Sequence, residues 1–341
     1  MRLLKYMIRR LLILTLMLIA LTLLVFAVIQ LFTPEERATL FVKEPRELRS
    51  IPTIIKKYHL DESVFIQYQT WITEVFKGNL GWSQTANKPV LTAILQKLPA
   101  TIELLMFSIP ITILVGIFLG VKSAEHRDKP FDHGIKIFSV VGYSLPTFWF
   151  AILLLAVFFA WLGWFPPERI GPVARNFTFS PSWIGYTGIF TIDGLLNGQL
   201  WITLDALRHL VLPTIVLAAA NIAIVVLVAR SNMIEILRKR YIAVVTAKDW
   251  TPNEVTIKRM RLSTLFPAST LLELLFGSIL TSIIVVETVF NFDGLGRLAA
   301  NAAIRLDIPS LLGFTLFSGF FFVILSLVVD IVYACVDPRI R

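Results

Sequence analysis

The chain has 341 residues, of which 56% are apolar and 16% charged, and its formal net charge is +9. Soluble domains are usually about 45–50% apolar and about 25% charged, so this composition argues against a soluble globular protein. A single cysteine, Cys335, excludes an internal disulfide and a zinc site built from cysteines. The histidines are scattered and show no metal-ligand spacing: His59, His126, His133 and His209.

Six apolar runs are each long enough to cross a bilayer, since a helix needs about 20 apolar residues to span the hydrocarbon core. They are residues 11–32, 101–121, 135–162, 210–229, 267–290 and 311–334. The first run follows the basic start MRLLKYMIRR, as in a signal peptide, but it is long for a signal and no small-x-small cleavage site follows it. We therefore expect a retained membrane anchor at this end of the chain.

The distribution of lysine and arginine orients these spans. Six spans put both termini on one side, and the segments of that side are more than twice as dense in basic residues as the others. Because basic loops stay in the cytoplasm, both termini are expected there, and the positive charge indicates topology rather than nucleic-acid binding. The predicted inner segments are 1–10, 122–134, 230–265 and 335–341, and the outer ones are 33–100, 163–208 and 291–310.

Prolines lie within or beside several predicted spans, at Pro110, Pro146, Pro213 and Pro267. Proline removes a helical hydrogen bond and kinks a helix where neighbouring helices can satisfy the freed carbonyl. Two explanations stay open for these prolines: irregular packing, or bent helices that line a path.

The two longer outer segments each carry an apolar pattern. From Val64 to Phe76, apolar residues recur every three to four positions, which predicts an amphipathic helix that ends at Gly78. Such a helix either lies on the membrane surface or packs on the bundle. Aromatic residues recur through 163–208, and they form either an interfacial belt or a docking surface for an extracellular protein.

The segment 241–267, between the fourth and fifth spans, is the most informative part of the chain. Helical periodicity continues to about Lys248 and stops at Asp249 and Trp250. A new helix is then signalled, and a membrane protein has little reason to keep a well-capped hairpin inside unless a partner binds it. The pattern predicts two helices joined by a turn that fit a groove on another protein.

The start of the second helix is clearly marked. Thr251 is a good N-cap, Pro252 suits the first helical position, and Glu254 lies three residues after the cap, which completes a capping box. The helix is basic, because Lys258, Arg259 and Arg261 follow. These cations either pair with acidic groups of a partner or are solvated.

This segment resembles the EAA loop of ABC importer permeases. In that family a triplet of small residues precedes a glycine, and a proline-containing end closes the loop. Here VTA at 245–247 occupies the triplet, FP at 266–267 closes the pattern, and Asp249 replaces the expected glycine. Aspartate enters left-handed backbone conformations less easily than glycine, so this position departs from the family.

Other motifs sharpen the resemblance to the B-type permease of oligopeptide and dipeptide importers, and they reach from the first outer segment to the last residue. They are YHLD at 58–61, GNLG at 78–81, LPATIEL at 98–104, SLPTFW at 144–149, LGWFP at 162–166, LRHLVLP at 207–213, VETVFNFDGLGRL at 286–298 and DIVYACVDPRIR at 330–341. Asp293 stands where many relatives have proline, which is a smaller departure.

The resemblance implies an all-α integral membrane protein with the type I ABC importer permease fold, six transmembrane helices and both termini in the cytoplasm. Residues 1–100 would form an anchor helix and an outer loop, and residues 101–341 the permease core. The subunit would catalyse no reaction and would form half of a translocation path for oligopeptides or dipeptides. The family also imports oligosaccharides and nickel chelates, which stay open as alternative substrates of the same transporter.

The same resemblance implies partners in a bacterial or archaeal cytoplasmic membrane: a second homologous permease, two cytoplasmic ABC ATPases and an extracytoplasmic solute-binding protein. ATP and Mg would bind the ATPases, and this chain would bind no cofactor, metal or nucleic acid. The helix from Pro252 would be the coupling helix in an ATPase groove. The expected coupling residues are Ala247, Lys248, Asp249, Trp250, Thr251, Pro252, Glu254, Lys258 and Arg259.

Polar groups within the spans are candidates for the path, because a charge near the bilayer centre costs about 2.5–3.5 kcal/mol and normally faces a cavity or the bundle interior. Glu273, Asn221 and Glu287 are such groups, and Glu273 either lines the path or bonds a neighbouring helix. Arg230 lies toward the inner end of the fourth span. Asp330, near the inner end of the last span, is expected to form a structural ion pair.

Two rival functions fit the sequence less well. A self-contained channel or secondary transporter commonly shows internal repeats, and we find no convincing repeat between the two halves. A membrane enzyme is disfavoured because the sequence has no HExxH, no nucleophile elbow and no paired intramembrane aspartates. The chain also lacks a GxxxxGK loop, and GLGR at 294–297 is predicted to be a structural turn at the outer mouth.

Overall fold

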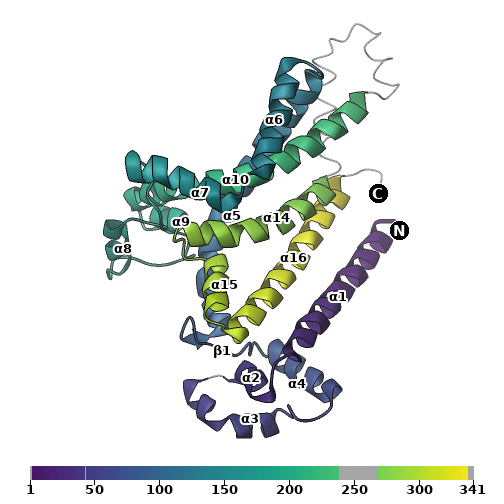
Figure 1. Cartoon of the computed structure of the whole chain (residues 1–341), viewed down its shortest axis with the longest axis vertical. Coiled ribbons are helices and arrows are strands. Elements are labelled where there is room, and N and C mark those ends of the chain that lie inside the picture. Colours follow the sequence, from purple (N-terminus) through teal and green to yellow (C-terminus); the bar gives the residue numbers. More distant parts are fainter. Residues whose placement is uncertain (1, 43, 238–267, 337–341) are drawn as a thin grey trace.

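The computed structural model describes residues 2–42, 44–237 and 268–336, and Figure 1 shows them as long helices, with α2, α3 and α4 at one end and α7, α8 and α9 at one side. Within these residues the prediction of an all-α protein is confirmed, because β structure is confined to one antiparallel pair, β1 (Trp82–Ser83) and β2 (Lys88–Pro89). The other elements are α1 (Arg2–Ile29), α2 (Pro34–Ala38), η1 (Thr39–Phe41), η2 (Pro45–Ser50), α3 (Ile51–Lys57), α4 (Val64–Phe76), α5 (Val90–Glu125), α6 (Pro130–Ser144), α7 (Thr147–Leu154), η3 (Leu155–Trp161), α8 (Pro172–Thr178), α9 (Phe190–Leu196), α10 (Leu200–Leu237), α14 (Ala268–Val289), α15 (Leu295–Ile304) and α16 (Ile308–Val336).

Four helices of the described chain are long and apolar enough to cross a membrane. They are α1, α5, α10 and α16, and each contains one of the predicted spans or most of it. The fifth predicted span coincides with α14, whose part Leu275–Val289 is apolar. The multi-pass character is therefore confirmed, and the number of six crossings stays a prediction.

The third predicted span is not one helix. Residues 135–162 were expected to cross as a unit, but α6 and the α7–η3 segment meet at an angle of 99°. The break falls at Leu145 and Pro146, where Leu145 is extended with φ −73° and ψ 124°. Proline lacks an N–H and disfavours helical backbone in the residue before it, so the kink expected at Pro146 becomes a sharp corner.

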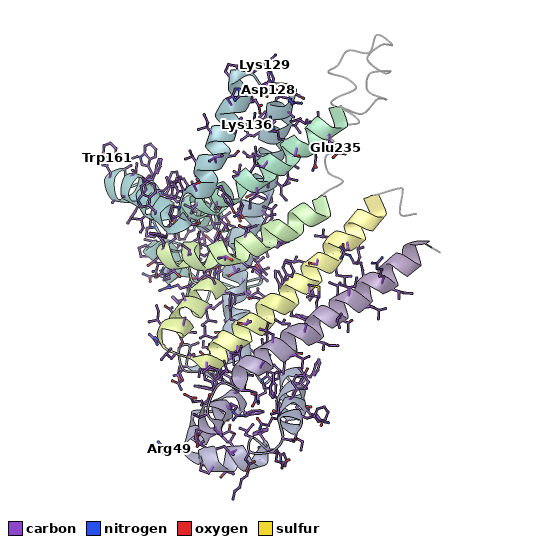
Figure 2. All side chains as sticks on the ribbon, turned by 45° about the vertical axis from the view of Figure 1, so that its right-hand side comes forward. Arg49, Asp128, Lys129, Lys136, Trp161 and Glu235 are labelled. Atoms are coloured by element: carbon purple, nitrogen blue, oxygen red, sulfur yellow. The ribbon has the colours of Figure 1, made fainter. Side chains whose placement is uncertain are left out.

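The ends of the long helices share one side of the molecule. Figure 1 shows the start of α1, the end of α10, the start of α14 and the end of α16 on that side, and Figure 2 places Lys129, Lys136 and Glu235 at one pole and Arg49 at the other. We call the side with Lys129 and Glu235 the inner side. The sequence predicts that it faces the cytoplasm.

Two glycines let α5 and α10 pack closely as parallel neighbours. A Cβ at Gly116 would lie 2.5 Å from Cβ of Val225, and a Cβ at Gly120 would lie 2.7 Å from Cβ of Ala229. Small residues at such crossings allow close backbone approach, which drives helix association in membranes. This pair forms the centre of the main apolar core, to which α7 and α14 also contribute.

Replacing Gly120 by alanine should lower the melting temperature of the purified protein in detergent. The added Cβ would meet Ala229 and the carbonyl oxygen of Val226 at 2.8 Å, and overpacking of a tight core costs about 1–3 kcal/mol. The matched control is Gly134→Ala in α6, where nothing lies within 4 Å of the new Cβ. The control should be neutral or gain about 0.5–1 kcal/mol; equal melting of the two variants would contradict the prediction.

The predicted amphipathic helix is confirmed as α4, and Gly78 follows it with φ +80°. Of the two arrangements left open, α4 packs on the bundle. The Trp71 ring lies 5.7 Å from that of Phe26 in α1, and the hydroxyls of Tyr68 and Thr22 are 3.0 Å apart. At the opposite end of α1, an ion pair fixes the helix to α16.

That ion pair joins Arg10 Nη2 and Asp330 Oδ1 at 2.6 Å, and the Asp330 side chain is almost completely buried. A buried carboxylate in a span needs a partner because desolvation penalises its charge. The structural pair predicted for Asp330 is therefore confirmed, and it connects the first and last helices near the inner side.

Candidate functional site

The predicted coupling segment lies outside the described residues. This holds for all the residues expected to contact the ATPases: Ala247, Lys248, Asp249, Trp250, Thr251, Pro252, Glu254, Lys258 and Arg259. The described chain contains both neighbouring helices, since α10 ends at Leu237 and α14 begins at Ala268 on the same side of the molecule. Their assignment to coupling stays a prediction.

A cluster of charged and polar side chains lies at the inner side, close to the end of α10. We call it the inner cluster, and it consists of Asp132, Arg230, Lys136 and Ser123. Both oxygens of Asp132 bind Arg230, with Nε to Oδ1 at 2.7 Å and Nη2 to Oδ2 at 2.8 Å. Lys136 Nζ lies 2.9 Å from Oδ2, and the Ser123 hydroxyl donates to Oδ1.

The inner cluster joins three helices through one carboxylate. Asp132 is in the first turn of α6 and has no exposed surface, Ser123 is in the last turn of α5, and Arg230 is in α10. The backbone N–H of Asp128 also donates to Oδ2 at 3.1 Å. Bidentate arginine bonds are strong and fix geometry, so the three inner helix ends are held in one arrangement.

A second buried carboxylate lies at the outer side. Glu287, in α14, is completely buried and accepts the Thr101 hydroxyl at 2.6 Å and the backbone N–H of Arg297 at 3.1 Å. Thr101 in turn accepts the N–H of Leu295 at 2.8 Å. We call this the outer cradle.

The outer cradle explains the GLGR sequence. A Cβ at Gly294 would lie 2.2 Å from Oε1 of Glu287, and a Cβ at Gly296 would lie 2.7 Å from Cα of Ile284. Only glycine leaves room for the carboxylate and for the close approach of α15 to α14. A turn was predicted for 294–297, whereas Gly294 is the N-cap of α15 and residues 295–297 are its first helical residues. The segment has a structural role, since it packs around Glu287, and its place at an outer mouth stays a prediction.

A third carboxylate, Glu103 of α5, holds the outer segment 163–208. It is 1% exposed, and its Oε2 lies 2.6 Å from Nη2 of Arg169, while its Oε1 accepts the N–H of Thr191 at 2.8 Å. Arg169 also donates to the carbonyl of Gly188 at 2.9 Å. Sequence analysis did not select this pair, although Glu103 falls in the LPATIEL motif; the buried partner 66 residues away gave no local signal.

An open cleft of about 620 Å³ lies at the outer side between α5, the outer segment and the turn before α15. Its wall mixes charged and aromatic residues, among them Arg169, Arg175, Phe179, Trp183, Asp293 and Arg297. Most of these charges are already paired, as in the contacts of Arg175 with Glu168 and of Lys97 with Asp293. The aromatic residues of this segment partly pack on each other, with Phe177 and Trp201 ring centroids 5.7 Å apart.

The three path candidates occupy different environments. Glu287 is enclosed by the outer cradle, so in this conformation its carboxylate contacts only the subunit itself. Asn221 is fully buried in α10, where Nδ2 donates to the Leu217 carbonyl at 2.7 Å and Oδ1 has no partner among the described residues. Glu273 lies in the first turns of α14, where side chains are outside the described set. Lining of a path by these residues stays a prediction.

Comparison with known proteins connects this geometry to a family. Residues 112–341 match the family described as binding-protein-dependent transport system inner membrane component, and residues 3–113 match the N-terminal region of that class of membrane component. Among the described residues, no group of histidine, cysteine, aspartate and glutamate side chains is arranged to hold a metal ion.

Similar proteins extend over nearly the whole chain. It is 33% identical to the dipeptide transport system permease protein DppB of Alkalihalophilus pseudofirmus, over 99% of both chains. It is 32% identical to the di/tripeptide transport system permease protein DppB of Pseudomonas aeruginosa, over 94% of both. Identity to the oligopeptide transport system permease protein AppB of Bacillus subtilis is 31%, over 98% of this chain and 99% of the relative.

Proposed function

Because the chain belongs to the family of binding-protein-dependent transport system inner membrane components, we propose that it is a permease subunit of an ATP-driven peptide importer. The observation that carries the proposal is its similarity, along almost the full length, to permeases described for dipeptides, di/tripeptides and oligopeptides. The four long apolar helices and the bent pair support a membrane-embedded role. Peptide is thus favoured over the oligosaccharides and nickel chelates that the wider family carries.

The proposed machine contains this chain, a second homologous permease, two cytoplasmic ATPases and an extracytoplasmic solute-binding protein in a bacterial or archaeal cytoplasmic membrane. The segment 241–267 would sit in an ATPase groove. ATP binding would bring the ATPases together and open the permeases outward, the binding protein would release peptide between the two permeases, and hydrolysis would reset the complex. ATP and Mg would bind only the ATPases.

Transport in proteoliposomes tests this proposal. The reconstituted complex with its cognate binding protein should take up labelled peptide only when ATP is supplied on the ATPase side. A binding screen of the binding protein against peptide, oligosaccharide and nickel-chelate libraries should select peptides. Uptake that persists with hydrolysis-deficient ATPases would favour a channel, and selection of a sugar or a chelate would overturn the peptide assignment.

We predict that Glu273→Gln changes the substrate preference without stopping transport. If Glu273 lines the path, its negative charge attracts the cationic end of a peptide, and neutralising it removes that attraction. The measurement is competition between peptides with free and acetylated N-termini during uptake. Glu125→Gln, at the inner end of α5, is the control and should leave the profile unchanged. An unaltered profile in Glu273→Gln would instead assign this residue to bonding with a neighbouring helix.

A further inference from the structure

The inner cluster holds a helix that has few buried residues of its own. Of the residues of α6, only Asp132 and Ser139 are buried. Beyond the cluster, α6, the start of α7 and α10 line an apolar hollow of about 360 Å³, whose lining includes Ile137 and Val141. At the start of α6, the polar contacts of Asp132 with Arg230 therefore act together with the apolar contact of Ile135 to fix the helix on α10.

The inner cluster lies between the predicted coupling segment, which follows α10, and the bent α6–α7 pair. Arg230 lies seven residues before Leu237, where α10 ends and the predicted coupling segment follows. In the other direction, α6 leads from Asp132 to the 99° corner at Leu145 and Pro146, and α7 beyond the corner contacts both α10 and α14. A displacement of the inner end of α10 thus reaches α6 through the Asp132 carboxylate.

Resting on the proposed function, we propose that the inner cluster is a brace that passes motion of the coupling segment to α6 and so to the bent α6–α7 pair. Asp132 and Arg230 are its positioning residues. The brace stays closed through the transport cycle and makes the inner ends of α5, α6 and α10 move as one body. Breaking the Asp132–Arg230 pair uncouples ATP hydrolysis from transport, because the ATPases still move α10 but α6 no longer moves with it.

The variants are chosen from the chemistry of the Asp132–Arg230 pair. Arg230→Gln removes the charge and the fork of two parallel N–H bonds, whereas Arg230→Lys keeps the charge but presents a point charge without the fork. The control is Arg10→Gln, which cuts the Arg10–Asp330 pair. The Arg10–Asp330 pair also joins two helices near the inner side, but it involves neither α6 nor α10. Arg10→Gln therefore shows the effect of losing an inner ion pair that is not part of the brace.

The first experiment measures peptide transported per ATP hydrolysed by the reconstituted complex. In Arg230→Gln this ratio should fall about tenfold, with binding-protein-stimulated hydrolysis retained, and Arg230→Lys should give an intermediate ratio. Arg10→Gln should keep the wild-type ratio. An unchanged ratio in Arg230→Gln, or an equal loss in Arg10→Gln, would overturn the brace. If Arg230→Gln fails to accumulate in the membrane, the ratio of Arg230→Lys decides by the same criterion.

The second experiment does not depend on transport. Spin labels at His133→Cys in α6 and Ser231→Cys in α10, introduced in a Cys335→Ser background, report the distance between the two helices in the assembled complex. The proposal predicts one narrow distance, unchanged by nucleotide, and a broad distribution once Arg230→Gln is added. A narrow distance in both forms would overturn the brace. Failure of the importer proposal looks different, because the wild-type complex would then transport no peptide although the distance result stood.

Discussion

Replacing Gly294 by alanine is expected to disrupt the outer cradle and reduce transport to below about a tenth of the wild-type rate. The new Cβ would lie 2.2 Å from Oε1 and 2.4 Å from Cδ of Glu287, so the carboxylate has to move. It cannot do so without leaving Thr101 and the N–H of Arg297. Leaving a buried polar group without its hydrogen-bond partner costs about 1–3 kcal/mol, and more than one such bond breaks here, which is a large part of the stability of an ordinary domain.

The effect of Gly294→Ala comes from space rather than from backbone strain, because Gly294 has φ −110°. Gly277→Ala in α14 is the matched control, since nothing lies within 4 Å of its new Cβ. A shorter carboxylate should partly relieve the clash, so Gly294→Ala combined with Glu287→Asp should recover melting temperature and transport relative to Gly294→Ala alone. Normal melting and uptake of the single variant would show that the outer cradle is not needed.

The outer cradle also shows why charge in a span is an ambiguous signal. The sequence analysis included Glu287 among the path candidates because a carboxylate inside a span carries a high free-energy cost and normally faces a cavity or the bundle interior. Its partners, Thr101 and the backbone at the start of α15, stabilise the carboxylate within the subunit. Glu103 binds Arg169 and Asp132 binds Arg230 in a similar way, so in this conformation these three carboxylates all bind groups of the same subunit.

Local patterns predicted local structure well. Apolar length located α1, α5, α10 and α16, and periodicity with a terminal glycine located α4, because these signals lie within the element itself. The kink at Pro146 was expected, but its 99° angle depends on how α7 packs after the corner. Nothing in the local sequence could pair Thr101 with Glu287, 186 residues apart, or Asp132 with Arg230, 98 residues apart.

For the predicted coupling segment, the prediction comes from the sequence alone, and the structure describes only the neighbouring helices α10 and α14. By residue type and spacing, Thr251, Pro252 and Glu254 predict a capping box. Such a box defines where a short helix starts, and a coupling helix has to start at a fixed place to fit a groove. Substitutions in this segment therefore test the proposed function most directly.

We expect Glu254→Lys to reduce transport by at least about tenfold while the amount of subunit in the membrane stays normal. The change would remove the predicted side-chain bond back to the N-cap and place a positive charge in the first turn of the predicted helix, where the helix dipole is unfavourable to it. Thr251→Ala should act in the same direction but less strongly, because loss of an N-cap costs about 0.5–2 kcal/mol. Co-purification of the ATPases with each variant measures the docking directly.

The control for Glu254→Lys is the same reversal of charge at Glu62, which lies just before α4 at the other end of the molecule from the inner side. Glu62→Lys should leave ATPase binding and uptake unchanged, because no cytoplasmic subunit reaches that end in the predicted orientation. A Glu254→Lys complex that retains its ATPases and transports at the wild-type rate would contradict the coupling-helix assignment. Loss of uptake with the ATPases still bound would instead place Glu254 in the transmission of motion, after docking and before the brace at Asp132.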